Sequence, residues 1–422
     1  MEFFMNAIAV AIFTCSIVKD TAAQGAQVQN NDNSEQFALL CRIYNVAKNP
    51  PIHHVDLQDP NKIVEDIDAL NSSLYEEKHI NETEQVENSS DVQLKLTTTR
   101  EAAVAQALLS RITQKAHTIL EEIRKVNATR NIEKVKGEFA KVVLGEMMNE
   151  SHLCDGALKD VKDRATACGN TGHSSKGASA GKNLVVDFFC LCAMRTDNSR
   201  QDKDGIENVC GVYVGSSKKN GNHGWGDACP VTSSTMWASI KKECGKRLQH
   251  YPKSTKDGHE VLEDFLKHLE LGGVYRWETT GKESSRKAGI LGTGVASEKE
   301  GKNILCDGKK GEKNGQPPGG VCVYYGPSDW GNNIPWMVKF KTALASADAL
   351  NNKTATIQRD IDKLQKLLRR AEEIYHTTQV ITEIQHPAVP KDFQTAAKRL
   401  TAYNAAWRQH PYAHSILLFV LL

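Results

Sequence analysis

Residues 98–150 have the sequence TTREAAVAQALLSRITQKAHTILEEIRKVNATRNIEKVKGEFAKVVLGEMMNE, and this stretch decides the fold class. Its apolar residues recur close to the three-and-four spacing of an amphipathic helix. At about 1.5 Å per residue, a single helix of this length would reach roughly 75 to 80 Å, far longer than a helix of a globular domain. The apolar stripe is expected at Val104, Leu108, Ile112, Ile119, Leu120, Ile123 and Val126.

A second flank, at about residues 338–380, repeats the pattern, with charged residues of both signs between the apolar ones. Its stripe is expected at Leu344, Leu350, Ile357, Ile361, Leu364, Leu368, Ala371 and Ile374. Alternating charge around such a stripe favours a coiled-coil helix. The nearly two hundred residues between the flanks can return the chain to its starting end, so the two helices are expected to lie antiparallel.

A shorter helix at residues 33–49, stopped by Pro50 and Pro51, offers a third apolar face. Three unrelated helices in separate domains would need linkers, and the chain has no Pro/Ser-rich tract to supply them. The face is expected at Phe37, Leu40, Cys41 and Tyr44. The predicted fold is therefore mainly α, an elongated antiparallel helical bundle with a coiled-coil stalk.

Glycine separates the middle of the chain from these flanks, because 27 of the 30 glycines fall between Gly156 and Gly331. Glycine costs about 1 kcal/mol in a helix interior, so the middle is not expected to be one long helix. We expect a disulfide-rich, lobed head at about 151–335 with short strands, turns and two helices. The strands are expected at 183–193, 210–214 and 321–326, the turns and loops at 271–277, 291–295 and 306–320, and the helices at 234–248 and 259–271.

The two ends of the chain carry processing signals. Residues 3–18 are an apolar run followed by small residues, which predicts a signal peptide at 1–23, although no Lys or Arg precedes the run. Small residues at 404–406, a polar spacer and an apolar end predict a glycosylphosphatidylinositol (GPI) signal attached at Asn404, with 405–422 removed. This leaves an ectodomain at 24–385 and a short membrane-proximal segment at 386–404. The alternative is a secreted protein whose tail is buried.

The number of cysteines is consistent with an exported protein. The chain has 11 cysteines, and removal of the signal peptide takes Cys15 and leaves an even number, which predicts a disulfide framework. Nine of the remaining ten lie at 154–322, so full pairing within one chain requires Cys41 to bond to that segment. Cys190 and Cys192 are separated by one residue, which favours bonds to different partners over a zinc site. The ten are Cys41, Cys154, Cys168, Cys190, Cys192, Cys210, Cys229, Cys244, Cys306 and Cys322.

Six sequons are available to an exported chain, three of them in a polar stretch at 71–90 that is expected to be an exposed loop. The candidates for glycosylation are Asn71, Asn81, Asn88, Asn127, Asn149 and Asn352. The formal net charge is +2, with no basic stripe carrying aromatic residues, so nucleic acid is not an expected partner.

Motifs that would indicate catalysis are weak. GTGVAS at 292–297 lacks the third glycine of a dinucleotide loop, and GASAGKN at 177–183 is one residue short of a phosphate loop, so a turn and a surface loop are expected instead. Asp187, beside Phe188, is expected on the polar face of a strand, with a buried acid of shifted pKa as the alternative. No catalytic residue, metal ligand or cofactor is predicted.

The order of several motifs resembles the variant surface glycoproteins of African trypanosomes, with B-type N-terminal domains of the congolense branch. The motifs are FALLC at 37–41, CGNTGHSSKGASAGKNLVVDFFCLCA at 168–193, WASIKKEC at 237–244, LGTGV at 291–295, CVYYGPSDWGNNIPW at 322–336 and the short tail. The resemblance covers most of the mature chain. No cysteine follows Cys322, so the cysteine-rich C-terminal domain of the brucei branch is absent here, as it is in the congolense branch.

The resemblance implies an elongated, GPI-anchored protein on the outer leaflet of the plasma membrane, usually a homodimer, in a dense coat that evades host antibodies by antigenic variation. A rod tethered by lipid has a small footprint, so many copies can stand side by side. Loops at 215–228 and 307–320 are the expected epitope tips. The alternative is a GPI-anchored receptor for a host serum protein on the same helical plan, because fold alone does not separate the two.

Overall fold

The computed structural model divides the chain into two compact units and is mainly helical, with one small sheet and five disulfides. The first unit comprises residues 1–53 and 128–352, and the second comprises 54–127 and 353–422. The structure describes residues 26–53, 59–83, 100–126, 128–161, 163–173, 175–195, 205–215, 224–225, 229, 233–248, 251–277, 284–311 and 319–385.

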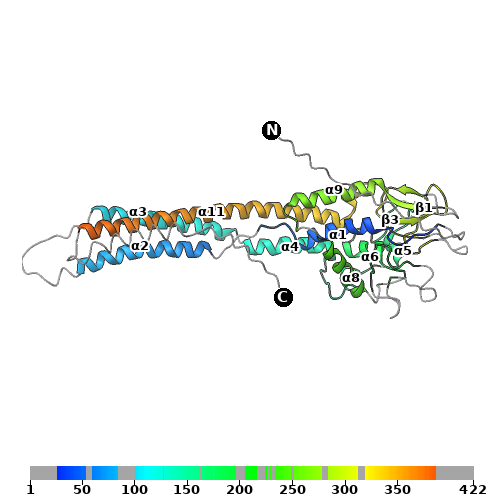
Figure 1. Ribbon diagram of the computed structural model, residues 1–422, viewed down its shortest axis with the longest axis horizontal. Helices are drawn as coiled ribbons and strands as arrows, with labels where there is room; N and C mark the ends of the chain where they lie inside the picture. The colour runs from blue at the N-terminus through cyan, green and yellow to red at the C-terminus, as the bar shows by residue number, and fades with distance from the viewer. Residues whose placement is uncertain are drawn as a thin grey trace, which may run out of the picture. The chain divides into compact units, whose positions relative to one another are not determined.

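Helices make up most of both units (Figure 1). The first unit holds α1 (Ser34–Lys48), α4 (Ala128–Leu144), α5 (Arg164–Cys168), α6 (Leu184–Cys192), α8 (Ser233–Lys246), α9 (Thr255–Leu271) and α10 (Trp330–Asn333). The second holds α2 (Asp59–Thr83) and α3 (Arg100–Lys125). The long helix α11 (Pro335–Gln385) contributes residues 335–352 to the first unit and 353–385 to the second.

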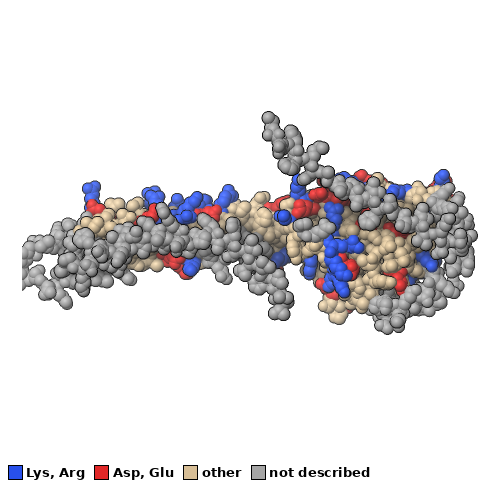
Figure 2. All heavy atoms as spheres, viewed as in Figure 1, with Lys and Arg blue, Asp and Glu red and all other residues tan. Residues whose placement is uncertain are grey.

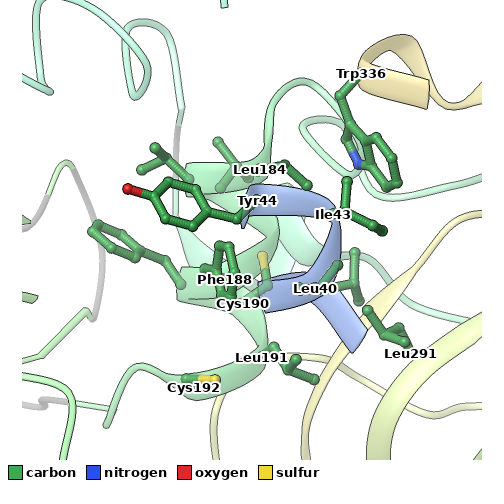
Figure 3. Packing of buried hydrophobic residues seen from close by; sticks show 14 of the residues in the cluster. Leu40, Ile43, Tyr44, Leu184, Phe188, Cys190, Leu191, Cys192, Leu291 and Trp336 are labelled. Atoms are coloured by element: carbon green, nitrogen blue, oxygen red, sulfur yellow. The ribbon is translucent and has the colours of Figure 1, made fainter. Parts of the chain in front are cut away.

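The core of the first unit is built where α1 crosses α6. Figure 3 shows Tyr44 of α1 beside Leu184 and Phe188 of α6, whereas Leu40 and Ile43 point toward Leu291 and Trp336. Edge-on aromatic contacts extend this packing, with ring centroids 5.7 Å apart for Phe37 and Phe188 and 5.6 Å apart for Tyr44 and Trp237. Such pairs add about 0.5 to 1.5 kcal/mol beyond their buried area. The helix expected at 33–49 is therefore confirmed, and so is its buried face: Phe37, Leu40, Cys41 and Tyr44.

The strand expected at 183–193 is wrong, because this stretch forms helix α6. All nine of its residues are buried, so there was no polar face from which to recognise a helical period. The helix begins at Asn183, whose side chain accepts a hydrogen bond from the backbone N–H of Val186. The strand expected at 210–214 is also absent, and Gly211 has a φ of +72° there, which suits a turn.

The sheet has the strand order β2-β1-β3-β4, with β1 and β3 parallel and the other two pairs antiparallel. Its strands are β1 (Gly273–Arg276), β2 (Ser284–Lys287), β3 (Ile290–Val295) and β4 (Gly320–Tyr324). Only β4, expected at 321–326, was predicted as a strand. The turns expected at 271–277 and 291–295 are wrong, since they contain β1 and β3. A Cβ on Gly294 would lie 2.4 Å from Cγ2 of Ile304, so this glycine permits close packing within a strand.

The single helix expected at 98–150 is also wrong, because α3 ends at Lys125 and α4 begins at Ala128. At the end of α3 the backbone N–H of Val126 bonds to the carbonyl of Ile123, a tighter turn than an α-helix makes. Gly145, with φ +77°, follows α4. The exposed loop expected at 71–90 is wrong in its first part, because α2 continues to Thr83.

In each unit, a helix of the first flank shares the core with part of α11. In the first unit, Phe139 of α4 and Phe340 of α11 meet edge-on at 5.7 Å. In the second unit, α3 packs antiparallel to α2, because its Gln106 bonds to Asn71 whereas its Arg124 bonds to Asn61. Helix α11 supplies the other buried face of the second unit at Ile357, Ile361, Leu364 and Ala371.

Candidate functional site

Five disulfides join all ten cysteines that follow the predicted signal peptide. The bond between Cys41 and Cys244 confirms that Cys41 pairs with the middle segment. Cys190 and Cys192 bond to different partners, Cys168 and Cys210, as their one-residue separation predicted. The other pairs are Cys154–Cys229 and Cys306–Cys322. All five lie in the first unit, so covalent crosslinks are concentrated in the lobe that contains the sheet.

A buried carboxylate lies at the centre of this lobe. Asp187 of α6 has no exposed surface, and its carboxylate accepts hydrogen bonds from the Tyr325 hydroxyl and the Trp336 indole, both at 2.7 Å, and from the Gly181 backbone N–H at 2.8 Å. Burial raises the pKa of Asp187 to about 6, although these three hydrogen bonds oppose the rise. The alternative of a buried acid is thus confirmed, and the polar strand face expected for Asp187 is wrong. The carboxylate ties α6 to the residue after β4 and to the first turn of α11.

A buried cation supports the other end of α6. Arg164 is 1% exposed and donates hydrogen bonds to the carbonyls of Cys190 and Ala193, where the helix ends. A cation at a helix C-terminus interacts favourably with the helix dipole. Burial lowers the pKa of Arg164 to about 9, and the nearby Asp307 carboxylate opposes this change. Asp307 itself bonds to Arg195 at 2.7 Å, so two guanidinium groups lie near one carboxylate.

In both nucleotide-like motifs, most backbone N–H groups already bond to other protein atoms. GTGVAS begins inside β3, whose residues pair with both β1 and β4. In GASAGKN, the backbone N–H groups of residues 177–182 bond to protein atoms. The surface position expected for this loop is wrong, because five of its seven residues are buried. Both stretches are therefore part of the packed structure of the first unit.

Within the described ranges, no group of three or more His, Cys, Asp or Glu side chains could hold a metal ion. Among those same residues, no helix combines the length and the apolar character that a membrane crossing requires. On the face drawn in Figure 2, Lys and Arg side chains gather over α1 and α8 in the first unit. Acidic side chains lie among them, as in the ion pair between Lys241 and Glu150.

Comparison with known proteins supplies the family. The model of the trypanosomal VSG domain matches residues 13–102 and 81–366, which is well over half of the chain. The chain belongs to this variant surface glycoprotein (VSG) family. The variant surface glycoprotein YnAT 1.3 of Trypanosoma congolense is 27% identical to it over 246 residues. The match covers 57% of this chain and 51% of that protein, so the chain spans about half the length of the curated relative it matches.

The modification sites expected of a VSG lie only partly within the described residues. Asn404, the predicted attachment site, and the tail at 405–422 lie outside them, as do Asn88 and Asn127. Asn81 lies in α2. Asn352 is exposed, in α11, whereas Asn149 is half-buried and accepts a hydrogen bond from the His152 backbone. Of the expected epitope loops, residues 216–223, 226–228 and 312–318 lie outside the described chain.

Asn71 has a different environment from the exposed loop expected for this VSG sequon. It lies on α2, half-buried, and its side-chain oxygen accepts hydrogen bonds from Gln106 at 3.1 Å and Ser110 at 3.5 Å. Both donors are on α3. The side chain thus forms part of the contact between two helices of the second unit.

Two features were missed from the sequence. Arg164 had no signal, because an isolated Arg at the start of a short helix does not indicate burial. The apolar stripe of α3 was predicted correctly at Ile112, Leu120 and Ile123, but at Val104 and Leu108 it was placed one position away from the buried face, which consists of Ala105, Leu109, Ile112, Ala116, Leu120 and Ile123. Val104 is 53% exposed and Leu108 is 37% exposed. The buried face contains two alanines, Ala105 and Ala116, which were not counted as part of the apolar pattern.

Proposed function

We propose that this VSG-family chain is a GPI-anchored coat glycoprotein that covers the cell surface densely and evades host antibodies by antigenic variation. The match of the VSG domain over residues 13–366 is the observation that carries the proposal. The disulfide-stapled lobe supports it, because five crosslinks stabilise a fold whose exposed loops can then change in sequence without unfolding it.

An elongated antiparallel bundle is part of the proposal. The length of α11, 51 residues, supports an extended molecule, and a narrow footprint would let many copies pack side by side.

We further propose that the protein is a homodimer. Stable anchoring generally takes two membrane signals, and a dimer would carry two lipids. Small-angle scattering of the purified ectodomain measures both its maximum dimension and its mass; a compact monomer would contradict this part of the proposal.

The anchor is tested by treating intact cells with a phosphatidylinositol-specific phospholipase C. Release of the protein into the medium is expected. Retention on the cells, or a peptide containing Leu422 recovered from mature protein, would contradict a GPI anchor. Asn404→Gln should lower the cell-surface amount, whereas the reverse exchange Gln409→Asn in the removed spacer should leave it unchanged.

Copy number separates the coat from the receptor alternative. A coat protein should be the dominant band among surface-labelled proteins, and its replacement by another family member should accompany loss of recognition by earlier host antibodies. A scarce protein that binds a host serum protein at nanomolar strength would instead identify a receptor.

A further inference from the structure

An apolar groove lies between α3 and α11 in the second unit. It has a volume of about 550 Å³. Its walls come from the first nine residues of α3 and from the part of α11 that precedes its end, which Figure 1 shows side by side. The apolar lining consists of Val104, Ala105, Leu108, Ile374 and Ile381, and the charged lining consists of Arg100, Glu101 and Glu373.

The groove leaves large apolar side chains in water. Val104 is 53% exposed and Leu108 is 37% exposed, although both line it. On α11 the apolar stripe continues past Ile381 to Ile384, which is 72% exposed, one residue before the helix ends at Gln385. Covering an exposed Val or Leu side chain stabilises a structure, because it removes apolar surface from water. The exposed stripe therefore runs toward the point where the chain leaves α11.

The sequence that follows could cover this stripe. Residues 386–422 lie outside the described structure, and residues 391–404 have the sequence KDFQTAAKRLTAYN. Their apolar residues fall at the three-and-four spacing of an amphipathic helix: Phe393, Ala396, Ala397, Leu400 and Tyr403. Pro390 precedes the pattern, Asp392 lies in its first turn, and Lys398 and Arg399 lie near its end, which are favourable positions in a helix.

The dimensions of this segment match the groove. The connection HPAVP at 386–390 has five residues, within the usual two to eight for antiparallel neighbouring helices. Phe393 and Leu400 would be about 10 Å apart along a helix, and Glu373 and Ile381 of α11 are about 12 Å apart on the same measure. The segment carries three basic residues and one acidic residue, and the groove lining carries two acidic residues and one basic residue, so their charges are complementary.

We propose that residues 391–403 form a short amphipathic helix that folds back into this groove as an additional helix of the second unit. The helix places Phe393 and Leu400 against Val104, Leu108 and Ile381. The proposal is based on the groove and the sequence pattern, and it does not depend on a GPI anchor. Its consequence is that the residue at 404 is held beside the bundle rather than at the end of a free linker.

Hydrogen exchange tests the proposal on the chain of mature length, residues 24–404. Backbone amides at 104–108 and 374–385 should exchange about tenfold more slowly than in a chain that stops at residue 385, a difference of about 1.4 kcal/mol. Leu400→Asp should remove this protection in the longer chain. Thr395→Asp, which changes the polar face of the same predicted helix, should keep it. Equal exchange in all four proteins would overturn the proposal.

A photoreactive residue at Val104 identifies the occupant directly. With benzoylphenylalanine at that position, irradiation should join it to a peptide from 391–403 of the same chain, at a yield that does not depend on protein concentration. The same probe at Leu271 of α9, which is 65% exposed in the first unit, should not label that peptide. Labelling of a second chain, labelling of residues 84–99, or no labelling would each show that the segment does not occupy the groove.

Discussion

The indole N–H of Trp336 donates a hydrogen bond to the carboxylate of Asp187 at 2.7 Å, although the two residues are 149 positions apart in the chain. Asp187 lies in α6, and Trp336 is the second residue of α11. Both side chains are fully buried. The long helix α11 is therefore fixed at its start to the core of the disulfide-bonded lobe by a polar contact whose strength depends on the charge of one acid.

This contact predicts a specific pH dependence. The pKa of Asp187 is raised from 3.8 to about 6, so the folded state binds a proton more tightly than the unfolded chain. The free energy of unfolding should therefore fall as pH rises from about 4 to about 6, by an amount on the order of 2 to 3 kcal/mol from this group, and level off above. Denaturant titrations at several pH values, followed by tryptophan fluorescence, measure this.

Asp187→Asn should lose this part of the pH dependence because the replacement does not titrate. Asp329→Asn, at an exposed position before α10, serves as the control and should keep the wild-type slope. Other acids contribute to the total slope, so the informative quantity is the difference between wild type and each variant. An identical slope in wild type and Asp187→Asn would show that the buried carboxylate does not titrate in this range.

Sequence patterns predicted those elements that have one buried and one exposed face. The helices at 33–49, 234–248 and 259–271 were found because their polar and apolar residues alternate with a helical period. Helix α6 was missed because burial on all sides removes that period, and β1 and β3 were missed because their glycines resemble turn signals. The odd number of cysteines at 154–322 predicted that Cys41 bonds to that segment, but only the structure shows that its partner is Cys244.

The polar interior was largely beyond sequence analysis. Asp187 was recognised as a possible buried acid only from its apolar neighbours, and its partners Tyr325 and Trp336 are more than 130 residues away. The groove was also missed, because a three-and-four spacing on α3 fits two adjacent stripes. One contains Val104 and Leu108, and the other contains Ala105 and Leu109. Only packing against the neighbouring helices decides between them.

The longest disulfide loop should contribute most to stability. Cys41–Cys244 closes 203 residues and Cys306–Cys322 closes 16. Loop entropy predicts about 3 kcal/mol for the short loop and about 5 kcal/mol for the long one. The Cys154–Cys229 bridge shortens the long loop and the other two nested bridges lie inside it, so a difference of about 2 kcal/mol remains. Cys41→Ala with Cys244→Ala should therefore lower the urea midpoint more than Cys306→Ala with Cys322→Ala. The opposite order would show that native-state packing, not chain entropy, dominates.

Gly308→Ala should destabilise the lobe. A Cβ at Gly308 would lie 2.5 Å from Nη1 of Arg164, and the residue has a φ of +83°. The buried guanidinium is held by the end of α6, so it has little room to move. The free energy of unfolding should fall by about 2 kcal/mol or more, because of backbone strain and disturbed hydrogen bonds.

Gly137→Ala is the matched control for that substitution. Gly137 lies in α4, and no atom beyond its own helix backbone and chain neighbours lies within 4 Å of the position that a Cβ would take there. An alanine there should raise the free energy of unfolding by about 0.5 to 1 kcal/mol, because it is the better helix former. Chemical denaturation of the two variants measures both changes. A Gly308→Ala protein as stable as wild type would mean that Arg164 can move away from its two carbonyl partners.

The sequons at Asn352 and Asn71 should differ in occupancy. Asn352 is exposed on α11, so a glycan attached there extends into solvent. Asn71 is half-buried between α2 and α3 and bonds to Gln106 and Ser110, so a glycan there would separate the two helices. Mass spectrometry of peptides after enzymatic deglycosylation in heavy-oxygen water should find the label at Asn352 and none at Asn71. Full occupancy of Asn71 in folded protein would instead require α2 and α3 to pack without that contact.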